Sequence, residues 1–328
     1  MKKKIAALGV LAAAALALAG CTDSAAPAPA GTSSASGGGE LTHVRVAALP
    51  IAETGALWAA IDQGIFADHG LDVEIVPAQG GAQAIPALLS GDIQFAVGQP
   101  FGPIRAAAQD LGIVIFSDYA DSLATGTDVN AVVASAASGI KTPKDLAGKK
   151  VSVNSLGAAG DLTIRAAVDA DGGDSSTIQF VEVAFPDVKA QLDAGTIDAG
   201  WVPDPFRGQI VSAGGTSVVA PYQATIPGLT VLTNFTTQKL IDSDPELVKK
   251  YAAAMSEALD WASKNESAVR SAIATNLKIP EAAAAGIVLP TFTSDLDVDN
   301  VKKLGALAVK YSYIDAEPDW NTLIQQQK

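Results

Sequence analysis

Four short stretches combine small residues with the expected start of a helix, and their residue types suit an anion. The first turn of a helix leaves backbone N–H groups without partners and carries a partial positive charge. Phosphate, sulfonate, nitrate and carboxylate oxygens bind at such ends. Ordinary helix capping is the alternative interpretation. The stretches are Thr54–Gly55–Ala56, Gly80–Gly81–Ala82, Asn154–Ser155–Leu156–Gly157, whose first two side chains add donors, and Phe185–Pro186–Asp187.

Aromatic, amide and acidic side chains near the expected strand ends are further ligand candidates. The aromatic rings could wall a cleft, although Trp58 also fits a buried helix face, and the amides could hydrogen-bond a solute. A buried carboxylate would seek an ammonium group or a cationic ring, whereas an exposed one would cap a helix. The helix starts would bind an acid group of the ligand, and these carboxylates would bind a cationic or donor group. Together they predict a zwitterion or a polar ring with an acid group. The candidates are Trp58, Gln83, Gln99, Asp187, Trp201 and Asp204.

Catalytic and metal chemistry have little support in the sequence. His43 and His69 do not form a pair at metal-ligand spacing. Asp295, Asp297 and Asp299 lack the glycine and the closing glutamate of a calcium loop. A serine nucleophile needs a base, and both histidines are expected at the surface. We therefore expect no enzyme activity, no metal and no cofactor.

Strands that alternate with helices must position these candidates. Such alternation indicates βαβ units on parallel sheets, where ligands bind beyond the carboxyl ends of the strands. A helix is expected from Leu57 through Phe66 to a stop at Gly70, and Asp161 is expected to cap another. The carboxyl-terminal part predicts helices over 245–263, 269–277, 280–287 and 298–311. Strands are predicted over 43–49, 71–76, 93–97, 112–119, 131–135, 151–154, 178–185, 197–202 and 229–235.

Two segments of the chain repeat the same order of elements. Residues 71–100 run strand, loop, helix and end in SGDIQFAVGQP, and residues 178–205 do the same and end in AGTIDAGWVPDP. Two such units with facing loops would enclose a cleft, with chain crossings near 129–135 and 222–235. The general repetition of α/β sheets is the alternative explanation.

The amino end has the form of a lipoprotein signal. Lysines at positions 2–4 precede an apolar run that is too short to span a membrane and ends in Leu18-Ala-Gly-Cys21. Residues 1–20 are predicted to be a signal peptide, with Cys21 as the lipidation site; a plain secretory signal is the alternative. Residues 21–40, rich in Ala, Pro, Ser and Gly, are expected to form a lipid-anchored flexible tether.

The chain is acidic, with a formal net charge of -13. No run of Lys or Arg follows the amino-terminal segment, so nucleic-acid binding is disfavoured, because phosphate neutralisation is its main source of affinity. No arginine falls directly within a candidate loop, although Arg105, Arg165 and Arg207 lie within a turn or two.

One stretch resembles a known family. GALWAAIDQGIFADHGLDVEIV at 55–76, followed by GGAQAIPALLSGDIQFAVGQP at 80–100, is similar to the first lobe of ABC-transporter solute-binding proteins of the nitrate/sulfonate/taurine type. This superfamily includes thiamine-pyrimidine binders. The resemblance implies an α/β, two-lobed, periplasmic-binding-protein-like fold (type II), each lobe a mixed sheet flanked by helices, with the ligand cleft between the lobes. Lobe 1 would comprise 41–130 plus 233–328, and lobe 2 would comprise 131–232.

The resemblance also implies a function. The protein would be an extracytoplasmic lipoprotein, anchored to the outer face of the cell membrane or periplasmic. It would deliver a small polar organic solute, sulfonate- or taurine-like or related, to an ABC permease and its cytoplasmic ATPase. We expect a monomer that binds no nucleic acid. The alternatives are a thiamine-pyrimidine-type binder, an enzyme of the same superfamily, which would use a histidine and lysine-bound pyridoxal phosphate, and a sensor subunit that feeds a receptor.

Overall fold

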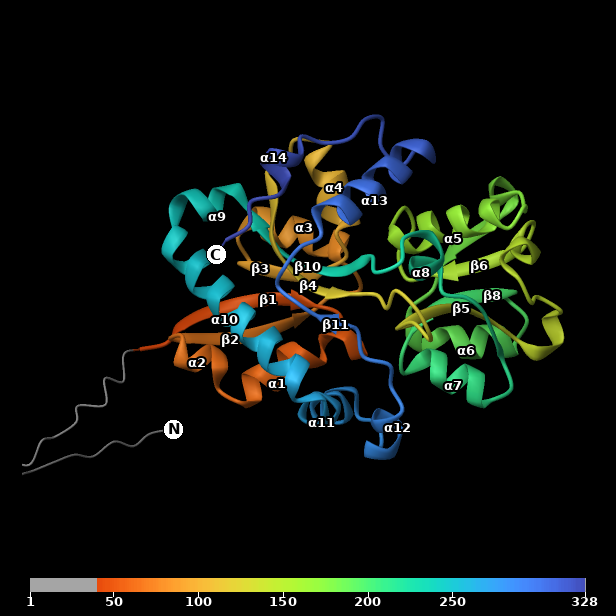
Figure 1. The fold of residues 1–328 in the computed structure, drawn as a ribbon, viewed down its shortest axis with the longest axis horizontal. Helices are drawn as coiled ribbons and strands as arrows, with labels where there is room; N and C mark the ends of the chain where they lie inside the picture. The colour runs from red at the N-terminus through yellow and green to blue at the C-terminus, as the bar shows by residue number, and fades with distance from the viewer. Residues whose placement is uncertain (1–39, 328) are drawn as a thin grey trace, which may run out of the picture. The chain divides into compact units, whose positions relative to one another are not determined.

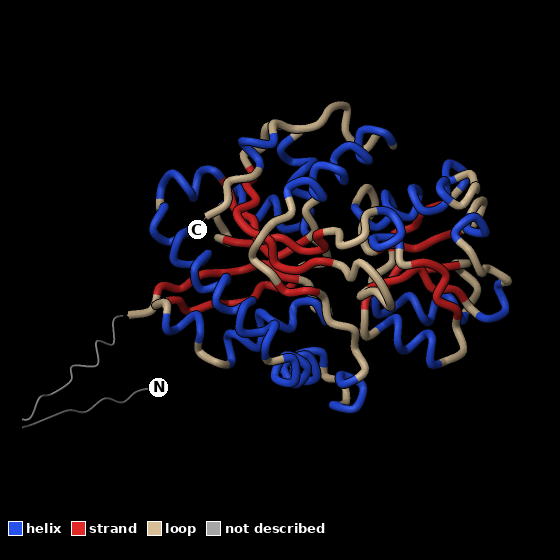
Figure 2. Tube along the Cα trace, in the orientation of Figure 1, coloured by secondary structure: helices blue, strands red, loops and turns tan. Residues whose placement is uncertain are grey.

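The structure, a computed structural model, describes residues 40–327, so the expected signal peptide, Cys21 and most of the tether lie outside the described residues. From Glu40 onward the chain forms one compact unit. Its strands form two sheets with helices around each (Figure 1), and Figure 2 shows the strands in two separate groups. The mixed α/β fold class expected from the sequence is confirmed. The lobe boundaries stay a prediction.

The six-stranded sheet has the order β11-β4-β10-β3-β1-β2, and the five-stranded sheet has the order β7-β6-β8-β5-β9. The first contains β1 (Thr42–Ala48), β2 (Leu71–Pro77), β3 (Phe95–Gly98), β4 (Ile113–Asp121), β10 (Thr230–Thr237) and β11 (Thr291–Phe292). The second contains β5 (Asn130–Ala134), β6 (Lys150–Val153), β7 (Gln179–Glu182), β8 (Ala199–Pro203) and β9 (Thr216–Val219).

Helices connect and cover these strands. Those of the first half are α1 (Gly55–Asp62), α2 (Ile65–Asp68), α3 (Gly81–Ser90), α4 (Phe101–Ala107), α5 (Ala159–Ala170) and α6 (Phe185–Asp193). The later ones are α7 (Phe206–Ser212), α8 (Pro221–Thr225), α9 (Gln238–Ser243), α10 (Pro245–Lys264), α11 (Glu266–Leu277), α12 (Glu281–Ala285), α13 (Val298–Lys310) and α14 (Trp320–Leu323). Short 3-10 turns are η1 (Ala52–Thr54), η2 (Ala136–Ser138), η3 (Pro143–Leu146) and η4 (Ser175–Thr177).

The two sheets repeat one arrangement, as the sequence echo suggested. Strand β1 pairs in parallel with β2 and β3, and β6 pairs in parallel with β7 and β8. An antiparallel strand then follows on the same side of each sheet, β10 beside β3 and β5 beside β8. Corresponding loops therefore leave the carboxyl edge of each sheet at equivalent positions.

The chain crosses between the sheets twice, from β4 to β5 and from β9 to β10. The two crossings are hydrogen-bonded to each other. The Ser122 N–H donates to the Leu229 carbonyl at 2.8 Å, and Gln223 Nε2 donates to the Leu123 carbonyl at 2.7 Å. Both crossings thus form one connection between the sheets.

The carboxyl-terminal part returns to the six-stranded sheet. Asp244 caps α10 by accepting from the Leu247 N–H, with Pro245 at the first helical position. Tyr251 of α10 stacks on Phe95 of β3 with ring centroids 3.9 Å apart, and both rings are fully buried. Strand β11 pairs with β4, which extends the same sheet.

Two local predictions are wrong, and a third is confirmed with a different geometry. The helix expected from Leu57 to Gly70 is two helices, because Gly64 adopts a left-handed φ of 80° between α1 and α2. The strand expected over 178–185 ends at Glu182, because α6 already begins at Phe185. Asp161 caps α5 as expected, but from the third position of the helix: its carboxylate accepts from the Gly157 and Ala158 N–H groups.

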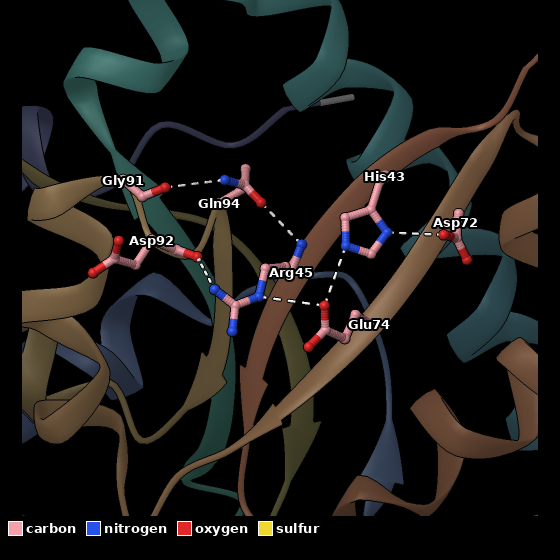
Figure 3. Close-up of polar contacts among 7 residues, drawn as sticks. All are labelled: His43, Arg45, Asp72, Glu74, Gly91, Asp92 and Gln94. Carbon is pink, nitrogen blue, oxygen red and sulfur yellow. Dashed lines mark hydrogen bonds and ion pairs between the residues drawn. The ribbon is translucent and has the colours of Figure 1, made fainter. Parts of the chain in front are cut away.

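A charged network covers the start of β1 and the edge strand β2 (Figure 3). His43 Nδ1 lies 2.8 Å from Asp72 and His43 Nε2 lies 3.2 Å from Glu74, and Arg45 Nε pairs with the same Glu74 at 3.3 Å. The Arg45 N–H also donates to Gln94 Oε1. Charged side chains on an edge strand discourage pairing with another chain. His43 thus has a surface role, at the opposite end of β1 from the candidate loops.

We expect Asp72→Asn to lower the pKa of His43 toward its ordinary value of 6.5. The pKa is raised, first by the hydrogen bond to Asp72 and also by Glu74. The pairing therefore stabilises the fold below the unfolded pKa and is lost as pH rises through the folded pKa. NMR titration of the imidazole in both proteins measures the shift. An unchanged His43 pKa in Asp72→Asn would contradict the assigned contact.

Candidate ligand-binding site

The loops at the carboxyl edges of the two sheets contact each other directly. Asn154 Nδ2, after β6, donates to the Gln79 carbonyl, after β2, at 2.7 Å. Arg105 Nη1 of α4 donates to the Gly157 carbonyl at 2.8 Å, and the Ala52 N–H donates to the Asp204 carbonyl at 3.4 Å. The candidate loops that the sequence placed far apart therefore meet at one junction.

Glycines allow close approach at this junction. A Cβ on Gly80 would lie 3.5 Å from Asn154 Nδ2 and 3.9 Å from the Ser155 Cβ, so Gly80 faces the opposite loop. A Cβ on Gly98 would lie 2.6 Å from the Gly81 Cα, which means that the loops after β2 and β3 touch backbone to backbone. Gly81 therefore has a packing role within its own sheet.

Thr54 and Gly55 of the first candidate stretch are held in the core, as is the candidate Trp58. Thr54 is fully buried and its hydroxyl donates to the Leu49 carbonyl at 2.6 Å. Gly55 faces α11, because a Cβ there would lie 2.6 Å from Ile273. Trp58 is buried in α1, which matches the alternative interpretation of a helix-core residue.

The helix start after β6 has fewer free donors than the sequence suggested. Gly157, with φ of 67°, donates its N–H to Asp161 Oδ2, and Ala158 donates to Asp161 Oδ1, both at 2.8 Å. The Leu156 N–H donates to Glu182 Oε2 at 3.2 Å. Carboxylates of the chain itself thus occupy positions that an anionic ligand would need. The half-buried Ser155 lies beside this turn.

The two glutamines and Asp187 lie at the rim of the junction. Gln83 is exposed, and its Oε1 accepts from the Gln79 N–H at 3.2 Å. Gln99 is half-buried, and its backbone lies against Gly81. Asp187 is exposed in the first turn of α6. Their predicted contacts with a ligand stay predictions.

Trp201 belongs to an aromatic cluster on the five-stranded sheet. Its ring centroid lies 5.6 Å from that of Phe185 and 5.5 Å from that of Tyr222, and its Nε1 donates to Asn130 at 2.9 Å. A Cβ on Gly160 would lie 3.0 Å from the Trp201 ring, so the ring packs on the α5 backbone. The hydrogen bond and these contacts fix the ring in one orientation.

Asp204 is buried and already paired. Its carboxylate accepts from Arg207 at 2.7 Å, from the Gly208 N–H at 3.1 Å and from the Val288 N–H at 3.3 Å. Val288 follows α12, whereas Asp204 follows β8. The Asp204 side chain therefore connects residues around the six-stranded sheet with residues around the five-stranded sheet. Its predicted role as a ligand carboxylate stays a prediction, and these partners already satisfy its charge.

Sequence reasoning missed Glu53, which lies in the η1 turn within the first candidate loop. Only 4% of the residue is exposed, and Oε2 has no hydrogen-bond partner among residues 40–327. Burial raises the pKa of this carboxyl group to about 8, and the nearby Asp204 and Asp128 charges act in the same direction. A lone acid inside the apolar run around Ile51 and Ala52 was the available signal.

Two more buried polar atoms close to Glu53 lack partners within the described part of the chain: Asp128 Oδ2 and the Tyr222 hydroxyl. Burial raises the pKa of Tyr222, and the charges of Glu53, Asp128 and Asp161 raise it further. Buried polar groups are normally hydrogen-bonded, so this cluster of unpartnered ones is a candidate position for another molecule.

Neither metal binding nor a membrane span is indicated by the described residues. Residues 40–327 contain no group of three His, Cys, Asp or Glu side chains arranged to hold a metal ion. Over the same range, no helix is both long and apolar enough to cross a bilayer.

The fold is that of periplasmic-binding-protein-like proteins. The alkanesulfonate-binding protein SsuA of Xanthomonas axonopodis pv. citri superposes with a TM-score of 0.72 at 15% identity, over 88% of this chain and 99% of that chain. The desulfurization enzyme DszB superposes with a TM-score of 0.67, also at 15% identity, over 87% of this chain and 97% of that chain. Binding proteins and an enzyme therefore share this fold.

A family model described as NMT1/THI5 like matches residues 52–268. The match covers more than half of the chain, so this protein belongs to the NMT1/THI5-like family, and the resemblance read from residues 55–100 is confirmed. A formylaminopyrimidine-binding protein of Halalkalibacterium halodurans is 29% identical over 143 residues, which are 44% of this chain. The match spans 41% of that relative's length.

We expect Gly98→Ala to lower the free energy of unfolding by roughly 1–3 kcal/mol, as overpacking does. The added methyl group would meet the Gly81 backbone at 2.6 Å, and backbone atoms cannot move aside as a flexible side chain can. Urea unfolding measures the change. Gly286→Ala is the control, because the nearest atom to its Cβ lies 3.7 Å away. Equal stability of the two variants would refute the backbone contact.

Proposed function

We propose that this protein captures a small polar organic solute at the junction of the two sheets and delivers it to an ABC permease with a cytoplasmic ATPase. The protein itself would be an extracytoplasmic lipoprotein and would act as a monomer. Family membership and the binding-protein fold support this proposal. The observation that carries it is the buried, unpartnered Glu53 Oε2 beside the unpartnered Asp128 Oδ2 and Tyr222 hydroxyl.

The chemistry of this cluster selects for a solute with N–H donors or a positive charge. A carboxyl group whose pKa lies near neutral pH can accept a hydrogen bond from an amine or from an amidine-like ring edge. This hydrogen bond is stronger when the carboxyl group is ionised. Trp201, Phe185 and Tyr222 offer ring faces and edges to a flat solute. Carboxylates at Asp128, Asp161 and Asp204 disfavour a purely anionic solute, and within the described chain only Asp204 of these three forms an ion pair, with Arg207.

Aminopyrimidines fit this description better than simple alkanesulfonates do. The relative from Halalkalibacterium halodurans is named for a formylaminopyrimidine, whose ring carries N–H donors and a flat face. SsuA is named for alkanesulfonates, whose head groups are anionic. We propose an amino-substituted ring, with aminosulfonates such as taurine as the next class. The rim residues Gly80, Asn154 and Ser155 would contact its polar tail.

Two measurements test the proposal. Mass spectrometry of the small molecule that co-purifies with the native protein identifies the solute directly. A thermal-shift screen of aminopyrimidines, aminosulfonates, alkanesulfonates, nitrate and amino acids then ranks the classes, because a ligand that binds the folded state raises the melting temperature. Stabilisation by nitrate or alkanesulfonates alone would refute the donor-bearing solute.

Glu53→Gln is expected to weaken binding of an aminopyrimidine by about 10–100-fold, which corresponds to roughly 1–3 kcal/mol for a lost charge-assisted hydrogen bond. For a cationic solute, affinity of the unchanged protein should rise with pH toward about 8, where Glu53 ionises. Glu53→Gln should remove that pH dependence. Isothermal titration calorimetry between about pH 6 and about pH 9 measures both effects.

The stability of Glu53→Gln supplies an internal check. The folded pKa of about 8 exceeds the ordinary 4.5, so the protein loses stability as pH rises from 4.5 through 8. Glu53→Gln should therefore gain stability relative to the parent as pH rises over this range. Glu246→Gln, at an exposed position on α10, is the matched control and should leave affinity and its pH dependence unchanged. If Glu53→Gln and Glu246→Gln had the same ligand affinity and the same change of stability with pH, the proposed role of Glu53 would be refuted.

Enzyme activity is the competing proposal, because the desulfurization enzyme DszB has the same fold. Both histidines of this chain pair with surface carboxylates, His43 with Asp72 and Glu74, and His69 with Glu257 at 2.8 Å. Neither contact involves the junction. An absorbance band of an internal aldimine in the purified protein would favour the enzyme proposal, and association with a receptor in a pull-down would favour a sensor subunit.

Cys21→Ser is expected to release folded protein into the soluble fraction, because Cys21 directly follows Leu18-Ala-Gly at the end of the apolar run. Acyl chains on this cysteine would provide the membrane affinity. Fractionation followed by immunoblotting measures the release. Retention of Cys21→Ser on membranes after a salt wash would contradict the lipid anchor.

A further inference from the structure

A polar cavity of about 600 Å³ lies along α5, and Glu53 is not among its lining residues. Its walls come from α4, α5, the η4 turn and the residues that end and follow α13. Helix α13 contacts both α4 and α5, and Figure 1 shows it running between them. Elements associated with both sheets therefore enclose this space, which we call the α5 cavity.

The α5 cavity gathers three cations in a chain of net charge -13. Arg105, Arg165 and Lys310 line it, together with the acids Asp169 and Asp174. Within residues 40–327, none of the three cations forms an ion pair with a carboxylate. The lining therefore carries an excess of positive charge that the described chain does not pair.

Both arginines are held in place yet keep donors available. A guanidinium has five N–H donors on three nitrogens. Arg105 uses Nη1 on the Gly157 carbonyl, and Arg165 uses Nε on the Tyr313 hydroxyl and Nη1 on the Ser175 carbonyl. The Arg165 guanidinium also lies 4.9 Å from the centre of the Phe180 ring. Each side chain is thus fixed, and its remaining nitrogens are free to bind.

The two acids that line the cavity with these cations already accept hydrogen bonds from other residues of the chain. Asp169 accepts from the Tyr311 hydroxyl at 2.7 Å and from the Ser175 N–H at 3.0 Å. Asp174 accepts from the Ser176 N–H and hydroxyl at 3.0 and 2.6 Å. Because neither carboxylate turns to the arginines, their remaining donors stay available to an oxyanion.

We propose that the α5 cavity binds a tetrahedral oxyanion, either free phosphate or sulfate or the same head group on an organic molecule. Arginine nitrogens in a planar fork match the oxygen spacing of such an anion, and partial burial strengthens the pairing. Lys310 supplies a further point charge at the mouth. An anion held by Arg105 of α4 and Arg165 of α5 links the surroundings of the two sheets and favours the arrangement in which they meet.

Inorganic phosphate is the probe, titrated into the full-length protein by isothermal titration calorimetry at constant ionic strength in potassium chloride. We expect saturable binding of one phosphate. Arg105→Gln and Lys310→Gln should each lower the phosphate affinity at least tenfold. Because Arg165 also packs on Phe180, the exposed Lys310 provides the variant least prone to misfolding. Methyl phosphate and ethanesulfonate in place of phosphate distinguish a head group from a free ion.

Lys302→Gln is the matched control, since it removes the same charge from an exposed position on the same helix. Its phosphate affinity should equal that of the parent protein. Absence of saturable phosphate binding would overturn the proposal. So would equal phosphate affinities of Arg105→Gln, Lys310→Gln and Lys302→Gln, because the charge effect would then be non-specific.

Discussion

The burial of the Glu53 carboxyl group has consequences for the whole junction between the sheets. A carboxylate removed from water without a partner is strongly disfavoured, and the group responds by holding its proton to a pKa of about 8. Asp128 and Asp204 surround it, and only Asp204 has a cation, Arg207, within the described chain. The hydrogen bonds donated by the Asn154 side chain and by the Ala52 N–H must hold this unfavourable arrangement together.

The two proposed sites have opposite electrostatic characters. Around Glu53, the chain's own carboxylates satisfy the helix-end N–H groups, as Asp161 does for Gly157 and Ala158. In the α5 cavity, the arginines keep nitrogens free and the carboxylates are occupied. Arg105 links the two regions, because it lines the cavity and also bonds the Gly157 carbonyl of the junction loop. A cationic solute would thus bind at the Glu53 cluster, and an oxyanion would bind in the α5 cavity.

Periodicity and helix-stop residues predicted most of the architecture because they act locally. Gly91 ends α3 in a left-handed conformation, and Asp244 with Pro245 starts α10, as their types indicate. The site was less predictable, because its features depend on partners distant in sequence. Gly55 has the type expected of an anion loop yet packs on Ile273, more than two hundred positions away. Asp204 has the type expected of a ligand carboxylate yet bonds Arg207 and Val288. Glu53 was identified in the structure because its buried Oε2 has no hydrogen-bond partner among the described residues.

The hydrogen-bonded pair of chain crossings limits how the two sheets can move. Ser122 joins Leu229 and Gln223 joins Leu123, so the crossings act as a narrow ribbon. A ribbon bends easily across its flat face, but it resists splaying, because splaying would break its cross-links. We therefore expect relative motion of the sheets mainly about one axis along the crossings. The proposed solute would then be selected by its thickness between the two faces more strictly than by its length.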